Sequence, residues 1–410
     1  MSEITGEPPL TGECPYYPMA RDPRRPLDPP AEYQRLREQA PVSRVRVWDG
    51  SSPWLVTRYR DVRKALAEPQ LHKDPRLPGF PHISPSSRLR STRVLPFSFR
   101  PDAEYLVQRR LLVRDFSQRR MQALRPFMEQ VVNEQLDALL AGPNPADLHD
   151  NFALPVATHV ICKVLGIAPH GRERLHGLSR IIGSRSASQD RVADAASEME
   201  RFFRDLVAAN LRTPEPGLIG RIVDAEVRPG RLAPADAAAT FQLLFFAGHG
   251  PSAYMIGLGL VALLRHPAEL EELRSADPQL LEHAVDELLR YVTVSHNGRQ
   301  RAATADITVG GQLIRAGEGV LIQLDAANRD PMAFDHPDQL DFHRSGPAHV
   351  ALGRGLHICT GQWMGRILLQ AVFGVLAARV PSLRLAVPFE QLRFKESEAL
   401  IGLHELPVTW

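Results

Sequence analysis

The sequence predicts a mainly α-helical fold with small β-sheets, arranged around one long buried helix. Apolar residues recur with helical spacing almost continuously from Ala103 to about Asn210. The run 237–265 is apolar on nearly all sides, which is typical of a helix in the centre of a large protein. Alternating, strand-like patterns are short and few. We therefore expect a helical body that carries small sheets.

The elements follow from local patterns in chain order. The Pro-rich residues 1–24 predict an irregular arm, and residues 25–410 are long enough to form one large domain or two or three smaller ones. Dense proline over 69–101 predicts a long loop. Helices are expected in AEYQRLREQ and RDVRKALAEP, over 121–140, 192–210, 237–265, 267–275 and 278–292, and after Gly361. Strands are expected in VSRVRVWD, PWLVTRY, ADITVGG, QLIRAGEG, GVLIQLDAAN and LHELPVTW.

Composition excludes several classes of protein. The net charge of +2 and the charged fraction of 23% do not indicate a nucleic-acid-binding protein. The three cysteines are far apart, so they form no disulfide or zinc-finger pattern, which fits a reducing compartment. The N-terminus lacks the pattern of a signal peptide, and polar residues such as Gln242 and His249 interrupt the longest apolar run. We expect a cytoplasmic protein with no membrane partner.

Cys359 lies in the most informative stretch, AHVALGRGLHICTGQWMGR. Gly353 and Gly355 lack a Cβ, so the backbone can turn tightly against a flat cofactor. The helix expected after Gly361 has an N-terminal dipole and free N–H groups, which favour a negatively charged sulfur. These features suit a thiolate ligand of haem iron, which favours O–O cleavage. A buried structural cysteine is the alternative.

Five motifs occur in the order ELLRY, RxA, ANRDP, LDFHR and GRGLHICTG. This order resembles that of a bacterial cytochrome P-450 of secondary metabolism, and the resemblance covers the chain from about Arg25 to Trp410. The family pattern around the ligand is Phe-Gly-x-Gly-x-His-x-Cys-x-Gly. The sequence matches it except at the first position, where Leu352 replaces the aromatic residue. The resemblance implies a cytochrome P-450 fold in a single catalytic domain over residues 25–410, with a long central helix over the haem.

The resemblance also implies roles for individual residues. Cys359 would be the proximal ligand of haem b (iron protoporphyrin IX), and thus the metal ligand. Tyr105 stands where the family usually has a histidine; its phenol can donate a hydrogen bond but carries no positive charge. The implied propionate-binding residues are His357, Arg301 and Arg109. The implied structural network is Glu287, Arg290 and Arg344. Other residues implied around the cofactor are Leu352, Gly353, Gly355 and Ala247.

The largest departure from the family lies in the long apolar helix. The family usually reads Ala-Gly-x-acid-Thr there, where the acid and the threonine deliver protons to iron-bound dioxygen. This chain has Gly250 in place of the acid and Pro251 in place of the alcohol. The usual proton relay is therefore expected to be absent, although Ala247 and Gly248 are kept. Three replacements stay open, namely His249, Ser252, or a hydroxyl or phenol of the substrate.

These observations support two classes of function. The first is a haem-thiolate oxidase that uses dioxygen and external electrons on a peptide- or polyketide-like secondary metabolite. Within it, hydroxylation competes with oxidative cross-linking of aromatic groups. The second is a non-catalytic helper subunit, although the kept Cys359 argues against it.

Other molecules are also implied by the sequence. The chain has no flavin or iron–sulfur motif, so ferredoxin and ferredoxin reductase are the expected electron donors, with the arginines of 109–120 as a docking face. A solvated helix face explains those arginines as well. The basic 70–100 loop could contact a peptide-like substrate or a carrier protein.

Overall fold

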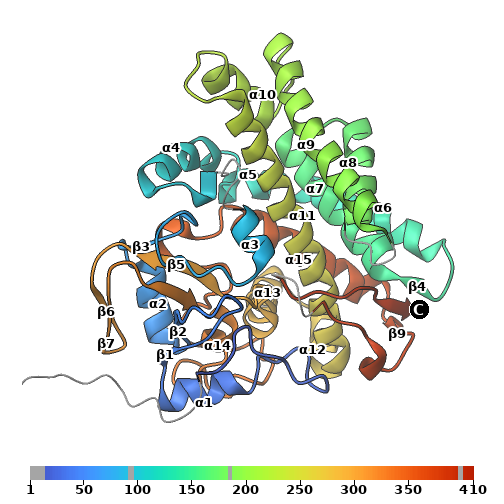
Figure 1. The fold of residues 1–410 in the computed structure, drawn as a ribbon. Helices are drawn as coiled ribbons and strands as arrows, with labels where there is room; N and C mark the ends of the chain where they lie inside the picture. The colour runs from blue at the N-terminus through green and yellow to red at the C-terminus, as the bar shows by residue number, and fades with distance from the viewer. Residues whose placement is uncertain (1–13, 91–96, 183–186, 396–399) are drawn as a thin grey trace, which may run out of the picture.

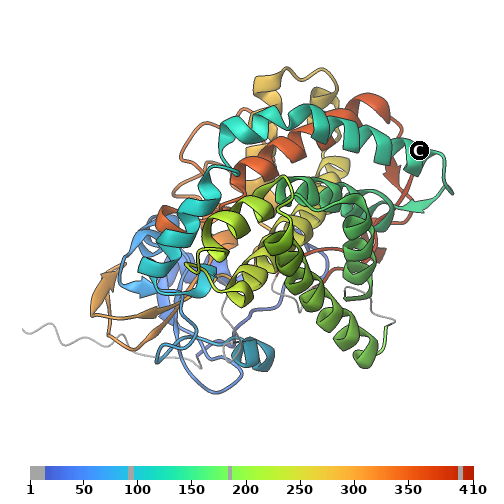
Figure 2. The ribbon, with the colours of Figure 1, turned by 90° about the horizontal axis from the view of Figure 1, so that it is seen from above.

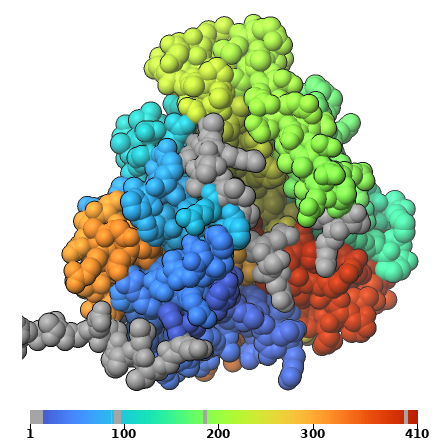
Figure 3. Space-filling view, viewed as in Figure 1, coloured from blue at the N-terminus to red at the C-terminus, as the bar shows by residue number. Residues whose placement is uncertain are grey.

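The computed structural model describes residues 14–90, 97–182, 187–395 and 400–410. Helices fill the upper and right-hand parts of the molecule in Figure 1, and the largest sheet lies at the lower left. In the space-filling view, the orange residues near position 300 lie beside the blue N-terminal residues (Figure 3). The predicted mainly α-helical fold with small sheets is confirmed.

The long helix α11, Pro234–Arg265, forms the centre of the helical body. It packs against helices on several sides, most extensively α7 (Leu154–Leu165) and α9 (Gln189–Arg212). A Cβ on Gly248 would lie 2.5 Å from the Ile161 side chain, so this glycine lets α11 approach α7 closely. By length and composition α11 could cross a bilayer, but 67% of its most apolar window is buried inside the protein.

Two further helices place the cysteine stretch beneath α11. They are α13 (Pro278–Val292) and α15 (Gln362–Arg379), and both contact α11 as well as each other. The view from above shows α11 between the green helices and the red α15 (Figure 2). The helix predicted after Gly361 begins at the next residue, so Cys359 lies just before its N-terminus.

The largest sheet has five strands in the order β1-β2-β8-β5-β3. Strands β2 and β8 are parallel, and the other neighbours are antiparallel. The strand bounds are β1 Val42–Arg44, β2 Trp54–Val56, β8 Gly319–Ile322, β5 Arg299–Ala303 and β3 Leu71–His72. Strand β5, second from one edge, carries side chains to the site described below.

The remaining elements complete the helical body and two small sheets. The other helices are α1 Glu32–Gln39, α2 Tyr59–Ala67, α3 Pro85–Arg90, α4 Asp102–Val113, α5 Gln118–Ala123, α6 Arg125–Leu140, α8 Pro169–Ile182, α10 Leu218–Ile222, α12 Pro267–Arg274 and α14 Leu324–Asn328. The small sheets pair β4 (Ala146–Asp147), β10 (Pro407–Thr409) and β9 (Arg384–Leu385), and β6 (Ile307–Val309) with β7 (Gln312–Ile314).

Three local predictions differ from the structure. The segment LDAAN forms helix α14 rather than the end of a strand. The loop predicted over 69–101 contains β3 and α3, which are too short to show a period, and residues 91–96 lie outside the described residues. Strand β5 was not predicted, because its polar sequence RQRAA does not alternate and pairing with β8 determines its conformation.

The described part of the N-terminal arm is fastened to the core. Tyr17 is fully buried, and its hydroxyl donates a hydrogen bond to the Gln323 side chain at 3.0 Å. The Arg21 guanidinium forms a buried ion pair with Asp325 at 2.8 Å. Residues 14–24 are therefore irregular, as predicted, but they pack on the segment that follows β8.

Candidate active site

The cysteine stretch turns sharply before helix α15. Gly353 and Gly355 have φ values of 76° and 68°, in the left-handed region that favours glycine. The Cys359 N–H donates to the Leu352 carbonyl at 2.9 Å, which closes the loop. Both glycines are thus required by backbone conformation, in agreement with the tight turn expected from the sequence.

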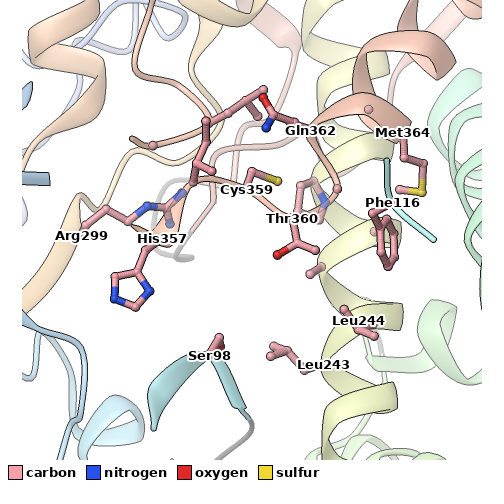
Figure 4. A pocket seen from close by; sticks show the side chains of 18 of the residues that line it. Ser98, Phe116, Leu243, Leu244, Arg299, His357, Cys359, Thr360, Gln362 and Met364 are labelled. Atoms are coloured by element: carbon pink, nitrogen blue, oxygen red, sulfur yellow. The ribbon is translucent and has the colours of Figure 1, made fainter. Parts of the chain in front are cut away.

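The Cys359 sulfur points into open space (Figure 4). A cavity of about 400 Å³ lies between the cysteine loop and α11. Figure 4 shows Arg299 and His357 on one side of the sulfur, and Phe116 and Met364 on the other. Burial raises the pKa of the Cys359 thiol, while the Gly361 N–H and nearby guanidinium groups act in the opposite direction.

A buried ionic network lies behind the cysteine loop. The Glu287 carboxylate accepts two hydrogen bonds from Arg290, both at 2.7 Å, and one from the Arg344 Nε at 3.0 Å. Arg290 also donates to the Asn328 carbonyl at 2.8 Å, and the Asn328 side chain accepts from the Val350 N–H at 2.8 Å. The structure thus brings the three sequence-predicted residues together, and Asn328 connects them to the loop.

One edge of the cavity collects the sequence-predicted polar residues. The Arg109 guanidinium donates to the Tyr105 hydroxyl at 2.5 Å and to the Ile358 carbonyl at 2.9 Å. The Tyr105 hydroxyl donates to the Leu356 carbonyl at 3.2 Å. His357 contacts Asp102 through Nε2 at 3.0 Å, and its ring lies 4.5 Å from that of Tyr105. Arg109 and Tyr105 therefore hold the cysteine loop directly.

The opposite wall of the cavity is formed by α11. Ala247, Gly248, Pro251 and Ser252 line the cavity, so the sequence placed this part of the helix correctly. Pro251 has no N–H, and the Ala247 carbonyl therefore lacks its usual partner one turn later in the helix. Among the residues of α11 that line the cavity, Ser252 carries the polar side chain.

His249 faces away from the cavity. It is 6% exposed, does not line the cavity, and stacks on Phe245 with ring centroids 5.2 Å apart. Burial lowers its pKa from 6.5 to about 3, so the imidazole is neutral near pH 7. Its Nε2 has no hydrogen-bond partner among the described residues. Gly250 does not line the cavity either, and a Cβ there would meet no atom within 4 Å.

Comparison with known proteins decides the family. Cytochrome P450 GfsF of Streptomyces halstedii is 38% identical over 401 residues, which cover 97% of each chain. Its crystal structure has a TM-score of 0.93 to this chain and covers 97% of this chain and 100% of GfsF. The chain belongs to the cytochrome P450 family.

Other comparisons agree with this assignment. The family model described as Cytochrome P450 matches residues 217–377. Cytochrome P450 CYP105Q4 of Mycobacterium marinum is 40% identical over 407 residues and 98% of each chain. The 20-oxo-5-O-mycaminosyltylactone 23-monooxygenase of Streptomyces fradiae is 38% identical over 396 residues, or 96% of this chain and 92% of that enzyme. The protein is thus a cytochrome P450 monooxygenase.

The cavity of this P450 fits the family's haem cofactor. A sulfur that can become a thiolate faces it, and basic side chains that suit carboxylates collect at one edge. Cys359 would hold the iron, and the basic edge would hold the propionates. Bound haem supplies the iron at which dioxygen is reduced. The loop hydrogen bonds and the network around Glu287 hold Cys359 in position for this ligation.

Two cationic residues at this edge were missed from the sequence. Lys73, directly after β3, and Arg299, on β5, both line the cavity. Arg299 lies two residues before Arg301, so both side chains lie on the same face of the strand. This spacing could have predicted Arg299 as a site residue if β5 had been recognised as a strand. No sequence pattern predicts Lys73 at the site, because only the fold of the 69–101 segment brings it there.

Proposed function

We propose that this P450 oxidises a bulky, mainly apolar secondary metabolite of the peptide or polyketide type, and that the substrate supplies a proton donor that α11 lacks. One observation carries the proposal. The part of α11 that lines the cavity carries no carboxylate or threonine; it consists of Leu243, Leu244, Ala247, Gly248, Pro251, Ser252 and Met255. Ser252 is then the hydroxyl that α11 offers to position water beside a substrate.

The character of the cavity wall supports an apolar substrate. Aromatic and aliphatic side chains surround the space between Ser98 and α11 (Figure 4). Apolar pockets with few polar groups bind mainly by removing apolar ligand surface from water, and the polar groups set orientation. These apolar residues are Phe80, Phe97, Phe99, Phe116, Ile161, Leu243, Leu244, Met255 and Val294. A polyketide would suit such an apolar wall. The related Streptomyces fradiae enzyme is named as a monooxygenase of a tylactone derivative, which is consistent with this class of substrate.

Oxidative coupling of aromatic groups is the second candidate reaction. It is favoured by the missing acid–alcohol pair, because abstraction of hydrogen from phenols or indoles replaces insertion of oxygen. Hydroxylation is favoured by its frequency in the family. A substrate hydroxyl near Ser252 serves either reaction.

The electrons come from a redox partner, as in bacterial P450s generally. We propose ferredoxin, reduced by ferredoxin reductase, as that partner. Exposed arginines follow α4 and its exit, and Leu356 of the cysteine loop is 36% exposed beside them. An acidic partner would meet these cations and reach the cysteine side of the haem by a short path. The exposed arginines are Arg110, Arg114, Arg119, Arg120 and Arg354.

The remaining parts of the proposal concern cofactor form and setting. Haem b is the proposed form of the cofactor, and residues 25–410 are the proposed catalytic domain, working in the cytoplasm. A substrate tethered to a carrier protein would approach by the 70–100 segment. Part of the charge there is paired internally, as in the ion pair between Arg76 and Asp74 at 2.7 Å.

A ligand screen tests the proposal. Macrolide-like compounds and small aromatic peptides are titrated against the ferric enzyme, and binding is detected from the shift of the haem spectrum. Hits are then incubated with ferredoxin, its reductase and NADH. A product heavier by one oxygen indicates hydroxylation, and a product lighter by two hydrogens indicates coupling. Binding confined to small polar compounds would contradict the proposed substrate class.

A further inference from the structure

The basic edge of the cavity holds more positive charge than the sequence-predicted residues supply. Lys73, Arg299, Arg301 and Arg109 all belong to this edge, which we call the cationic edge. Lys73 follows β3, and Arg299 and Arg301 extend from the adjacent strand β5. Cations from two paired strands and a helix therefore converge on one end of the cavity.

Nearby carboxylates do not balance this charge. Within the described ranges, no Asp or Glu oxygen lies within 4.0 Å of the Lys73, Arg299 or Arg301 cations. Asp102 is an acidic group that interacts electrostatically with Arg301. Its carboxylate already contacts His357. Burial and the neighbouring guanidinium groups lower the pKa of Lys73 well below its usual range. An anionic ligand bound among these groups would stabilise their positive charge and oppose the loss of a proton from Lys73.

One of the sequence-predicted propionate contacts is already occupied within the protein. The Tyr105 hydroxyl uses its single proton on the Leu356 carbonyl, so it has no proton left for a carboxylate. Arg109 donates through Nη1 to Tyr105, to the Ile358 carbonyl, and to the Thr360 hydroxyl at 3.2 Å. Both side chains thus fasten the cysteine loop, while the Nε and Nη2 donors of Arg109 remain for an anion.

Lys73 stands beside the position that the family usually fills with histidine. Its Nζ lies 5.8 Å from the centroid of the Tyr105 ring and 5.6 Å from that of Phe99. A lysine here provides the positive charge that the phenol of Tyr105 cannot provide. Its flexible stem also allows the ammonium to reach a carboxylate within the cavity.

We propose that Lys73 and Arg299, together with Arg301, bind the haem propionates, and that Lys73 replaces the charge lost at Tyr105. Tyr105 then acts on the cysteine loop instead, and Arg109 fastens that loop through Nη1, while its Nε and Nη2 donors take no part in these bonds. The inference rests on the haem cofactor of the family and is independent of the proposed substrate. It assigns to Lys73 and Arg299 a role that the sequence motifs do not give them.

The rate of haem loss tests this assignment. Transfer of haem from the ferric holoenzyme to excess apomyoglobin is followed for the wild type and for Lys73→Gln. Loss of a charge-assisted hydrogen bond should speed transfer about tenfold or more. Lys64→Gln is the matched control, because Lys64 is exposed on α2 and donates to the Thr308 carbonyl at 2.7 Å. This control should transfer haem at the wild-type rate.

A second arm distinguishes propionate binding from general loosening of the site. Wild type and Lys73→Gln are reconstituted with the dimethyl ester of haem, whose carboxylates are blocked. The two proteins should then lose the cofactor at the same rate. A persistent difference with the ester, or equal rates with normal haem, would overturn the proposal. If Lys73→Gln does not fold, the same pair of measurements on Arg299→Gln decides the question in the same way.

Discussion

The two walls of the active site are built on different principles. On the cysteine side, the functional groups are held by charged partners, as Glu287 is by Arg290 and Arg344. On the α11 side, the cavity is bounded by small and apolar groups, with Ser252 as the polar side chain. The difference shows that several charged contacts fix the position of the cysteine loop. Under the proposed function, the chemistry on the α11 side depends instead on the substrate.

The strongest test of the cysteine side is removal of its sulfur. Cys359→Ala should abolish the red-shifted Soret band of the reduced, carbon-monoxide-treated enzyme, because that band depends on thiolate ligation. Activity should be lost with it. Cys162→Ala is the matched control, since Cys162 is buried on α7 away from the cavity. An unchanged band in Cys359→Ala would refute the ligand assignment.

The next largest effect is expected for the network that supports the cysteine loop. Glu287→Gln removes the anion from the buried Arg290 and the half-buried Arg344, and should lower the free energy of unfolding by about 3–5 kcal/mol. Denaturant unfolding, followed by loss of the Soret band, measures this change. Glu282→Gln, at an exposed position on the same helix, should stay within about 0.5 kcal/mol of the wild type. Equal stability of the two variants would show that the network is dispensable.

On the α11 side, a substitution should stabilise the protein rather than weaken it. Pro251→Ala restores the N–H that the Ala247 carbonyl lacks, and should raise the free energy of unfolding by up to about 3 kcal/mol. Pro234→Ala is the control, because proline at the first position of a helix has no such penalty. A loss of stability in Pro251→Ala would mean that the proline ring supports the cavity wall.

A smaller effect concerns acid stability. The pKa of His249 is about 3 in the folded protein and 6.5 for an unperturbed histidine, so the unfolded chain binds the extra proton between these values. Stability should therefore fall as pH decreases below 6.5, by about 2 kcal/mol from this group at pH 5. His249→Leu should show a shallower decline of unfolding free energy between pH 7 and pH 5. His283→Gln, at an exposed position on α13, should follow the wild-type curve. Identical slopes for His249→Leu and wild type would contradict the assigned burial.

Much of the site could be predicted from sequence because its motifs are local. The glycines at 353 and 355 and the proposed ligand Cys359 lie in one loop, and Glu287 with Arg290 lie one helical turn apart. The positions that escaped prediction depend on tertiary pairing. Lys73 reaches the cavity only because β3 pairs with β5.

The direction of side chains on α11 was also beyond the sequence. His249 and Ser252 were both open as candidates, but the His249 ring stacks on Phe245 whereas Ser252 lines the cavity. Likewise, the sequence did not show which group the Tyr105 hydroxyl bonds. In the structure it donates a hydrogen bond to the Leu356 carbonyl of the cysteine loop. Such choices depend on which groups compete for each hydrogen bond.

The most direct test of the central claim compares a hydroxyl-bearing substrate from the ligand screen with its O-methylated analogue. Measured with ferredoxin and its reductase, the wild type should convert the first to product and divert electrons to hydrogen peroxide with the second. Gly250→Asp combined with Pro251→Thr restores the acid–alcohol pair, and open space at Gly250 accommodates the new side chain. This double variant should form product from both compounds. Equal product yield from both compounds in the wild type would contradict a substrate-assisted reaction.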